Sequence, residues 1–303
     1  MIGSVAIATP AAAGVPLAWA RVRTSRHQVD LVSATGASRP ASATDCFCPG
    51  ETLSTSASAK AEVVFSDGSL ARVGEQAQLQ FWPHTRDLRL SQGTVALFVS
   101  PSQGRTTLQT PNAKVGINSS GMVVRHVPSR GLTLVMALAN SPTGPVSITV
   151  TATGQEFVLN AGQMAFISAN NLQVVEFDLL EFYQTSDLLA GLQLANPNYR
   201  PAVDEPLAAL RPDLLQALSQ QAPFSSSDTI LDPSLITDFV AETNAQSVEL
   251  LAVPSLVEEF RRYNETPPGV VVPLPGNAAE PVAPAEPILP AESISPAGAL
   301  SDS

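Results

Sequence analysis

The strand pattern of this chain is set by the stretch Ala61-Glu62-Val63-Val64-Phe65-Ser66-Asp67-Gly68-Ser69-Leu70-Ala71-Arg72-Val73. Two short runs rich in apolar side chains flank the dipeptide Asp67-Gly68. Asp-Gly readily adopts the positive φ angles that a two-residue hairpin turn requires. The stretch therefore predicts two antiparallel strands, 61–65 and 70–73, joined by a tight turn.

The same rhythm extends outward from this hairpin, from residue 28 to residue 177. Runs of Val, Leu, Ile, Phe and Thr are interrupted about every 8 to 12 residues by Gly, Asn, Asp, Ser or Pro, which is typical of an all-β sandwich, barrel or roll. We expect a mainly β domain over residues 28–177, a sandwich or roll of about a dozen short strands. The run 94–99 is almost continuously apolar, which indicates a strand covered on both faces. The other predicted strands are 78–81, 88–90, 107–110, 113–117, 122–127, 132–138, 146–151, 155–159, 163–167 and 172–177.

The pattern changes at Asp178, after which apolar residues recur at helical spacing. Asp178 is a suitable N-cap for the first helix, and prolines mark the starts of the later ones. Because the apolar faces of the later helices are narrow, residues 178–263 are expected to form a loose helical appendage. The predicted helices are 178–192, 213–220, 234–243 and 254–263.

The last segment, 264–303, has a different composition. It contains nine prolines and five acidic residues but no Lys or Arg. Such a segment buries too little apolar surface to offset the entropy lost on ordering. We expect a disordered, Pro-rich acidic tail.

The charge balance argues against a nucleic-acid partner. The 303 residues carry 16 Lys and Arg against 27 Asp and Glu, a formal charge of −11. Only Lys60 and Lys114 are lysines, and the arginines are scattered. A surface that binds a phosphate backbone needs clustered positive charge, so no nucleic-acid partner is expected.

The amino terminus has features of a signal peptide. Residues 1–20 carry no charged side chain and end in Ala18-Trp19-Ala20, a small-x-small pattern like that of a signal-peptidase site. No other window approaches the ~20 consecutive apolar residues of a spanning helix, so no transmembrane segment is predicted. We expect a periplasmic or secreted protein. The alternative is a cytoplasmic protein that retains residues 1–20.

The two cysteines stand as Cys46-Phe47-Cys48. A disulfide between residues i and i+2 closes a cramped ring, and two thiolates are fewer than the four ligands of a structural zinc. The pair is interpreted as two half-buried small apolar residues beside the turn at Pro49-Gly50, with a redox or metal role as the alternative. Their role is left open at this stage.

Few residues point to catalysis. His27, His84 and His126 are too far apart in sequence to be grouped into one site, and His126, within the predicted strand 122–127, is interpreted as a surface or hydrogen-bonded structural histidine. Trp82, after Phe81, is a candidate for an aromatic sugar platform, although a core aromatic is favoured. The neighbouring carboxylates Asp204-Glu205 and Glu258-Glu259 are read as solvated charge. No catalytic, cofactor-binding or metal-binding residue is predicted, and no small-molecule cofactor is expected.

Five stretches of the sequence form a pattern when they are taken together: Gly50-Glu51-Thr52-Leu53-Ser54-Thr55, Ala61-Glu62-Val63-Val64-Phe65-Ser66-Asp67-Gly68-Ser69, Leu88-Arg89-Leu90-Ser91-Gln92-Gly93-Thr94-Val95, Leu108-Gln109-Thr110-Pro111-Asn112-Ala113 and Val158-Leu159-Asn160-Ala161-Gly162-Gln163. In their order and spacing they resemble the FecR domain of bacterial envelope and signalling proteins. The resemblance implies a periplasmic β module that engages protein partners and in some members relays a signal through a membrane helix to a sigma-factor regulator. This sequence shows neither that helix nor the regulator, and it has Asn118-Ser119-Ser120-Gly121 where the family usually has Gly-Thr, so sigma-factor control is not expected.

These observations predict a non-enzymatic, exported FecR-like module that binds an envelope protein or a cell-wall polymer, in signalling or in envelope structure. Strand addition at an exposed sheet edge is the expected mode of binding, with strands 122–127 and 132–138 as the first candidates. One alternative is a carbohydrate-binding or hydrolytic envelope protein, which would need His84, His126 or Trp82 in a cleft with an acidic side chain. The other alternative is a cytoplasmic regulator.

Overall fold

The computed structural model describes residues 14–101, 104–169, 171–202 and 205–222. The predicted helices 234–243 and 254–263 and the predicted tail 264–303 lie outside the described residues. Neither helix within the described ranges is long and apolar enough to cross a membrane.

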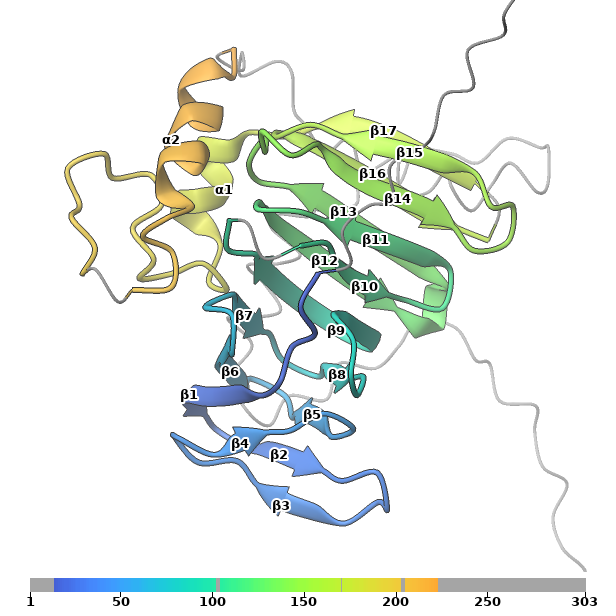
Figure 1. The fold of residues 1–303 in the computed structure, drawn as a ribbon. Helices are drawn as coiled ribbons and strands as arrows, with labels where there is room; N and C mark the ends of the chain where they lie inside the picture. Colours follow the sequence, from blue (N-terminus) through green and yellow to red (C-terminus); the bar gives the residue numbers. More distant parts are fainter. Residues whose placement is uncertain (1–13, 102–103, 170, 203–204, 223–303) are drawn as a thin grey trace, which may run out of the picture. The chain divides into compact units, whose positions relative to one another are not determined.

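The described residues form two sheets that share one strand, and the prediction of a mainly β sandwich or roll is confirmed (Figure 1). Sheet A contains, in spatial order, β4 (Cys46–Phe47), β1 (Ala20–Arg26), β6 (Lys60–Phe65), β7 (Leu70–Val73), the second half of β9 (Asp87–Phe98), β12 (Gly121–Val127), β13 (Leu132–Ala137), β16 (Gln163–Ser168) and β17 (Asn171–Glu176). Sheet B contains β3 (Ser38–Pro40), β2 (Val29–Val32), β5 (Thr52–Thr55), β8 (Gln78–Phe81), the first half of β9, β10 (Thr106–Gln109), β11 (Ala113–Ile117), β14 (Val146–Val150) and β15 (Glu156–Leu159).

Successive hairpins alternate between the two sheets in the second half of the fold. The hairpins β10–β11 and β14–β15 belong to sheet B, whereas β12–β13 and β16–β17 belong to sheet A. Each hairpin also pairs with the preceding hairpin of its own sheet, through β11–β14 and β13–β16. Because the chain passes to the opposite sheet after each hairpin, a turn or connection follows every short strand. This explains why the turn signals recur at short intervals.

Strand β9 passes from sheet B into sheet A. Leu88 to Gln92 pair with β8, and Gly93 to Phe98 pair with β12. The register of β8 and β9 shifts between Gln78 and Leu79, which leaves Ser91 as an extra residue, a β-bulge that bends the strand. Gly93 follows the bulge with a φ of 85°, a conformation that residues with a side chain rarely adopt. The bulge and the glycine together redirect the strand from one sheet to the other.

The core between the sheets is built from alternating side chains of both. In β9, Val95 and Leu97 point into this core, and in β12 Met122 and Val124 do so. At the amino-terminal end an aromatic group closes it: the rings of Phe47 and Phe65 lie 5.8 and 5.6 Å from the ring of Phe81. All three phenylalanines are fully buried.

A second core covers the outer face of sheet A. Ala96 and Phe98 of β9 contribute to it together with side chains of α1 (Leu179–Thr185) and α2 (Arg211–Gln220). Strand 94–99 is thus covered on both faces, as its continuous apolar run predicts. The Asp178 carboxylate accepts the Glu181 N–H at 3.0 Å, which is the predicted N-cap of α1.

The described part of residues 178–263 is packed rather than loose. Helix α1 ends at Thr185, earlier than predicted, and the chain that follows is fastened to sheet A. Arg72 of β7 donates to the carbonyls of Leu188 at 3.1 Å and Ala190 at 2.6 Å, and Lys60 of β6 pairs with Asp187. Both helices lie on the same side of the sheet (Figure 1).

The sheets begin at Ala20, ahead of the predicted start of the β domain at residue 28. The segment before β1 is also part of the folded structure. Leu17 is buried and donates to the Thr85 carbonyl at 3.0 Å, and Arg86 donates to the Val15 carbonyl at 3.1 Å. Cleavage after Ala20 would remove these contacts and expose the core, so a leader with that boundary does not agree with this packing.

We predict that Gly93→Ala lowers the free energy of unfolding by about 3 kcal/mol, because the added Cβ would overlap Ala77 in addition to the unfavourable positive φ. Gly36→Ala is the matched control, since Gly36 has the same φ of 85° but no atom within 4 Å of the added Cβ. Its expected cost is about 1 kcal/mol. Urea unfolding measures both, and equal losses would contradict the role assigned to the Gly93 bend.

Candidate functional site

The structure does not bring the three histidines together. His27 lies in the turn between β1 and β2 and His84 in the loop between β8 and β9, and both are exposed. Phe81 is part of the core, whereas the neighbouring Trp82 is 46% exposed. Neither His84 nor Trp82 lines the cleft described below.

His126 is buried within β12, on the core side with Val124. Its Nδ1 lies 2.9 Å from the hydroxyl of Thr133, which is fully buried and contacts the Thr110 hydroxyl at 3.0 Å. Thr133 also donates to the Asn112 side-chain oxygen, and the Asn112 amide donates to the carbonyls of Gly131 at 2.9 Å and Ile167 at 2.8 Å. This network joins three hairpins, and it satisfies each buried polar group in the way that a structural histidine requires.

A cleft of about 230 Å³ opens beside His126. It contains two carboxylates, those of Glu75 and Asp187, so His126 does share a cleft with acidic side chains. The full lining is Lys60, Gly74, Glu75, Gln76, Gln92, Gly93, Thr94, Arg125, His126, Val127, Pro128, Ser129, Asp187 and Leu188.

The groups of this cleft are already engaged with structural partners. Glu75 accepts the Ser58 N–H at 2.6 Å, and Asp187 pairs with Lys60. In the part of the chain that the structure describes, no ion pair joins His126 to either carboxylate, and no cluster of three potential metal ligands occurs. The hydroxyl that His126 contacts belongs to Thr133, which is fully buried and does not line the cleft, so this pair does not present a nucleophile to a substrate there.

The sheet edges provide a better candidate surface, and they differ between the two ends of the sandwich. At the amino-terminal end the outer strands are β3 and β4 (Figure 1). Strand β3 has three residues, among them Arg39 and Pro40, and β4 has only two residues. Short length, charge and proline are the features by which edges are protected from pairing.

The carboxyl-terminal end is less protected, because its charge is limited to Glu156 and Glu176 and one of its outer strands is six residues long. Its outer strands are β15 and β17, and β17 pairs with β16 along all six of its residues. Neither strand contains Lys, Arg or Pro. Val158 of β15 is 57% exposed and Val174 of β17 is 40% exposed. Among the described residues, β15 pairs only with β14 and β17 only with β16, so the outer side of each strand is unpaired there.

The two strands expected to accept a partner strand are not edges. Strand β12 lies between β9 and β13, and β13 lies between β12 and β16. The backbone N–H and C=O groups of both strands already pair with a neighbouring strand on each side. The prediction that 122–127 and 132–138 are candidates for strand addition is therefore wrong. Their apolar character reflects central positions with both faces covered.

The Asp67-Gly68 turn is held by a buried ion pair that the sequence pattern did not indicate. The Arg86 guanidinium donates to Asp67 at 2.5 Å and to the Thr106 hydroxyl at 2.9 Å. Asp67 also accepts the backbone N–H and the hydroxyl of Ser69, each at 2.9 Å. Both charged side chains are nearly inaccessible to solvent. Through Arg86, the ion pair connects the Asp67-Gly68 turn to β10 and to the segment at Val15. Nothing in the sequence marks Arg86 among the scattered arginines.

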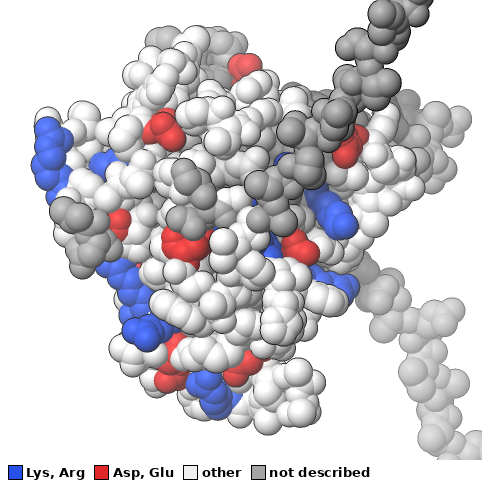
Figure 2. Space-filling view, viewed as in Figure 1, with Lys and Arg blue, Asp and Glu red and all other residues white. Residues whose placement is uncertain are grey.

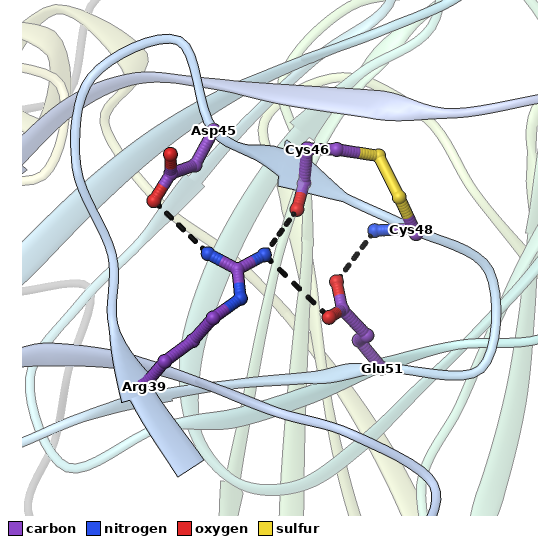
Figure 3. Close-up of a disulfide and its surroundings, with 5 residues drawn as sticks. All are labelled: Arg39, Asp45, Cys46, Cys48 and Glu51. Carbon is purple, nitrogen blue, oxygen red and sulfur yellow. Dashed lines mark hydrogen bonds and ion pairs between the residues drawn. A yellow bond between two sulfur atoms is a disulfide. The ribbon is translucent and has the colours of Figure 1, made fainter. Parts of the chain in front are cut away.

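The cysteines form a disulfide, Cys46–Cys48, with Cα atoms 5.3 Å apart (Figure 3). This corrects the interpretation of the pair as two small apolar residues. Arg39 lies across the same segment and donates to Asp45 and to the Cys46 carbonyl, each at 3.0 Å (Figure 3).

Charge does not define a binding surface on the face shown in Figure 2. Acidic and basic side chains are interspersed there, with broad uncharged areas between them. Recognition on such a surface depends on backbone groups and apolar side chains more than on a field of one sign.

We predict that the stability of the protein falls as the pH is lowered below about 6.5, because burial lowers the pKa of His126 from its usual 6.5. The unfolded chain then binds a proton that the folded chain does not, so acid favours unfolding. Urea midpoints between pH 8 and pH 5 test this, with an NMR titration of the His126 ring. A ring pKa above 6.5 would contradict the burial argument.

Comparison with known proteins places these strands in a family context. The family model described as FecR protein matches residues 51–137. A search of curated proteins gives no match. Two crystal structures of a putative anti-sigma factor from Parabacteroides distasonis ATCC 8503 are similar with a TM-score of 0.38 each, at 13% and 11% identity, over 43% and 44% of this chain. The similarity covers 61% and 64% of those chains, which is less than two thirds of their length.

The matched residues run from β5 to the end of β13 and include the Asp67-Gly68 turn, the Gly93 bend and the strand shared by both sheets. The resemblance predicted from the sequence is confirmed over this range. Over residues 51–137, this chain carries a FecR domain.

Proposed function

We propose that this chain is an exported, non-enzymatic recognition module in which the sandwich built around the FecR domain binds an envelope protein by strand addition at β17. The observation that carries the proposal is the contrast between the two ends of the sandwich. The edges β3 and β4 are short or carry Arg and Pro, whereas β17 offers six residues without a basic residue or proline. An edge of this kind is a template for pairing with another chain.

The apolar side chains at this end would supply specificity. Val174 pairs with Ala165 of β16, whose side chain belongs to the core between the sheets. Val174 therefore faces the mouth of that core, where Leu172 and Phe157 are partly buried. A partner strand beside β17 would place alternate side chains over these three residues while its backbone pairs with the edge.

Two features support export. The Cys46–Cys48 bond is of a kind that persists in oxidising compartments such as the periplasm. The uncharged, Ala-rich stretch 1–13, which precedes the packed segment at Val15, is the second feature.

The FecR domain supports a regulatory role in signalling for this recognition, because the resemblance implies a module that engages protein partners. A hydrolytic role is less well supported. His126, Glu75 and Asp187 share a cleft, but each is held by a structural partner, namely Thr133, Ser58 and Lys60. A carbohydrate-binding role would rest on the exposed Trp82, which lies outside this cleft.

We predict that Val174→Lys reduces binding of the envelope partner at least ~10-fold, because a lysine at the mouth of the core opposes strand pairing there. The partner is first identified in envelope extracts by a photo-crosslinker placed at residue 174 of the full chain. The matched control is Ser38→Lys, which adds the same charge to the protected edge β3.

Both variants are expected to unfold within ~0.5 kcal/mol of the parent, since both positions are exposed. Equal binding by the parent and Val174→Lys, or equal crosslinking from residues 174 and 38, would overturn the proposal. Retention of the protein on purified cell-wall polymer alone would also overturn it, in favour of the polymer-binding alternative.

A further inference from the structure

We propose that the Cys46–Cys48 disulfide is a thiol–disulfide exchange site, reduced and re-formed by an external dithiol while the fold stays intact. Cys46 lies in β4, an edge strand of sheet A that pairs only with β1 among the described residues, and Cys48 directly follows that strand. Both cysteines are partly exposed, so a second thiol can approach. This inference is independent of the binding surface at β17.

The bond contributes little as a structural crosslink. A disulfide stabilises a protein mainly by restricting the unfolded chain, and the restriction grows with the length of the closed loop. Here the two cysteines are separated by a single residue. The loop is therefore close to the shortest possible, and its closure removes little freedom from the unfolded state.

The segment is held in place by other contacts. Phe47, between the two cysteines, is fully buried, and it pairs with Ala20 of β1. On the other side of the segment Arg39 donates to the Cys46 carbonyl, and Glu51 accepts the Cys48 N–H at 2.8 Å (Figure 3). The Arg39 guanidinium also lies 3.6 Å from the Glu51 carboxylate, so it links the contacts at both ends of the Cys46-Phe47-Cys48 segment.

These contacts have a chemical consequence. Because they involve the backbone, Phe47 and Arg39 rather than the sulfur atoms, they persist when the bond is opened. The two thiols then remain next to each other, and ring closure stays intramolecular. A bond that contributes little to stability, yet is held ready to re-form, is suited to reversible exchange.

The step is a two-electron exchange. A thiolate of the dithiol attacks one sulfur of the Cys46–Cys48 bond, and the other sulfur leaves as a thiolate and takes up a proton. The second thiol of the reagent then attacks the mixed disulfide, releasing the remaining cysteine as a thiol. The chain gains two thiols, and the dithiol is oxidised to its own disulfide.

The test uses the oxidised full-length chain with dithiothreitol as the probe. Thiols are trapped with N-ethylmaleimide and counted by mass, and the fold is followed by circular dichroism. We expect both cysteines to be reduced without denaturant, faster than global unfolding, with an unchanged spectrum and urea midpoint. On transfer to oxidised glutathione, the bond re-forms within one chain. The double variant Cys46→Ser/Cys48→Ser provides the baseline for trapping and should have the same urea midpoint.

A second experiment tests the role of the Arg39 contacts. Arg39→Ala is expected to slow the intramolecular re-formation of the disulfide by at least about threefold, because the Cys46-Phe47-Cys48 segment loses the contact that orients it. Arg130→Ala, an exposed arginine of the distant 3-10 turn Pro128–Arg130, is the control and should have no effect. Reduction only at the rate of global unfolding, loss of the fold on reduction, or re-oxidation into crosslinked dimers would overturn the proposal.

Discussion

Strand β9 is hydrogen-bonded in both sheets, and the rest of the fold depends on this double role. Its first half lies between β8 and β10, and its second half lies between β7 and β12. A strand that leaves one sheet for another must bend, and the bulge at Ser91 and the left-handed Gly93 supply that bend. Because β9 is one continuous strand, the strands that pair with it in sheet A and in sheet B are held in a fixed relation to each other.

The two cores explain why the helices belong to the sandwich. Sheet A is apolar on both faces, so one face packs on sheet B and the other must be covered. Helices α1 and α2 and the chain between them cover it, and Arg72 and Lys60 fasten that chain to the sheet. The buried hydroxyl of Tyr183, which donates to the Leu138 carbonyl at 2.7 Å, completes this packing.

The strands were predictable because each is a short apolar run ended by a turn residue, and the Asp67-Gly68 hairpin is the clearest case. The partners of these strands were not, because pairing is decided by contacts between residues far apart in sequence. Strand 122–127 was therefore named as a candidate for strand addition, although β9 and β13 occupy both its sides. The Arg86–Asp67 pair was missed for the same reason. The Cys46–Cys48 bond was missed for a different one, because it depends on the local conformation of three consecutive residues, which their spacing does not reveal. The Thr110-Pro111-Asn112 motif marked Asn112 in the sequence. Nothing in the sequence marked Gly131 and Ile167, whose carbonyls accept from the Asn112 amide.

Strand β9 makes the two sheets one cooperative unit. Native-state hydrogen exchange in increasing urea tests this most directly, because it reports the free energy of opening for each strand. If β9 joins the sheets as described, the amides of β5 and β8 in sheet B will reach the same free energy of opening as those of β6 and β12 in sheet A. Two separate values, one for each sheet, would show that the sheets open independently and would contradict the account.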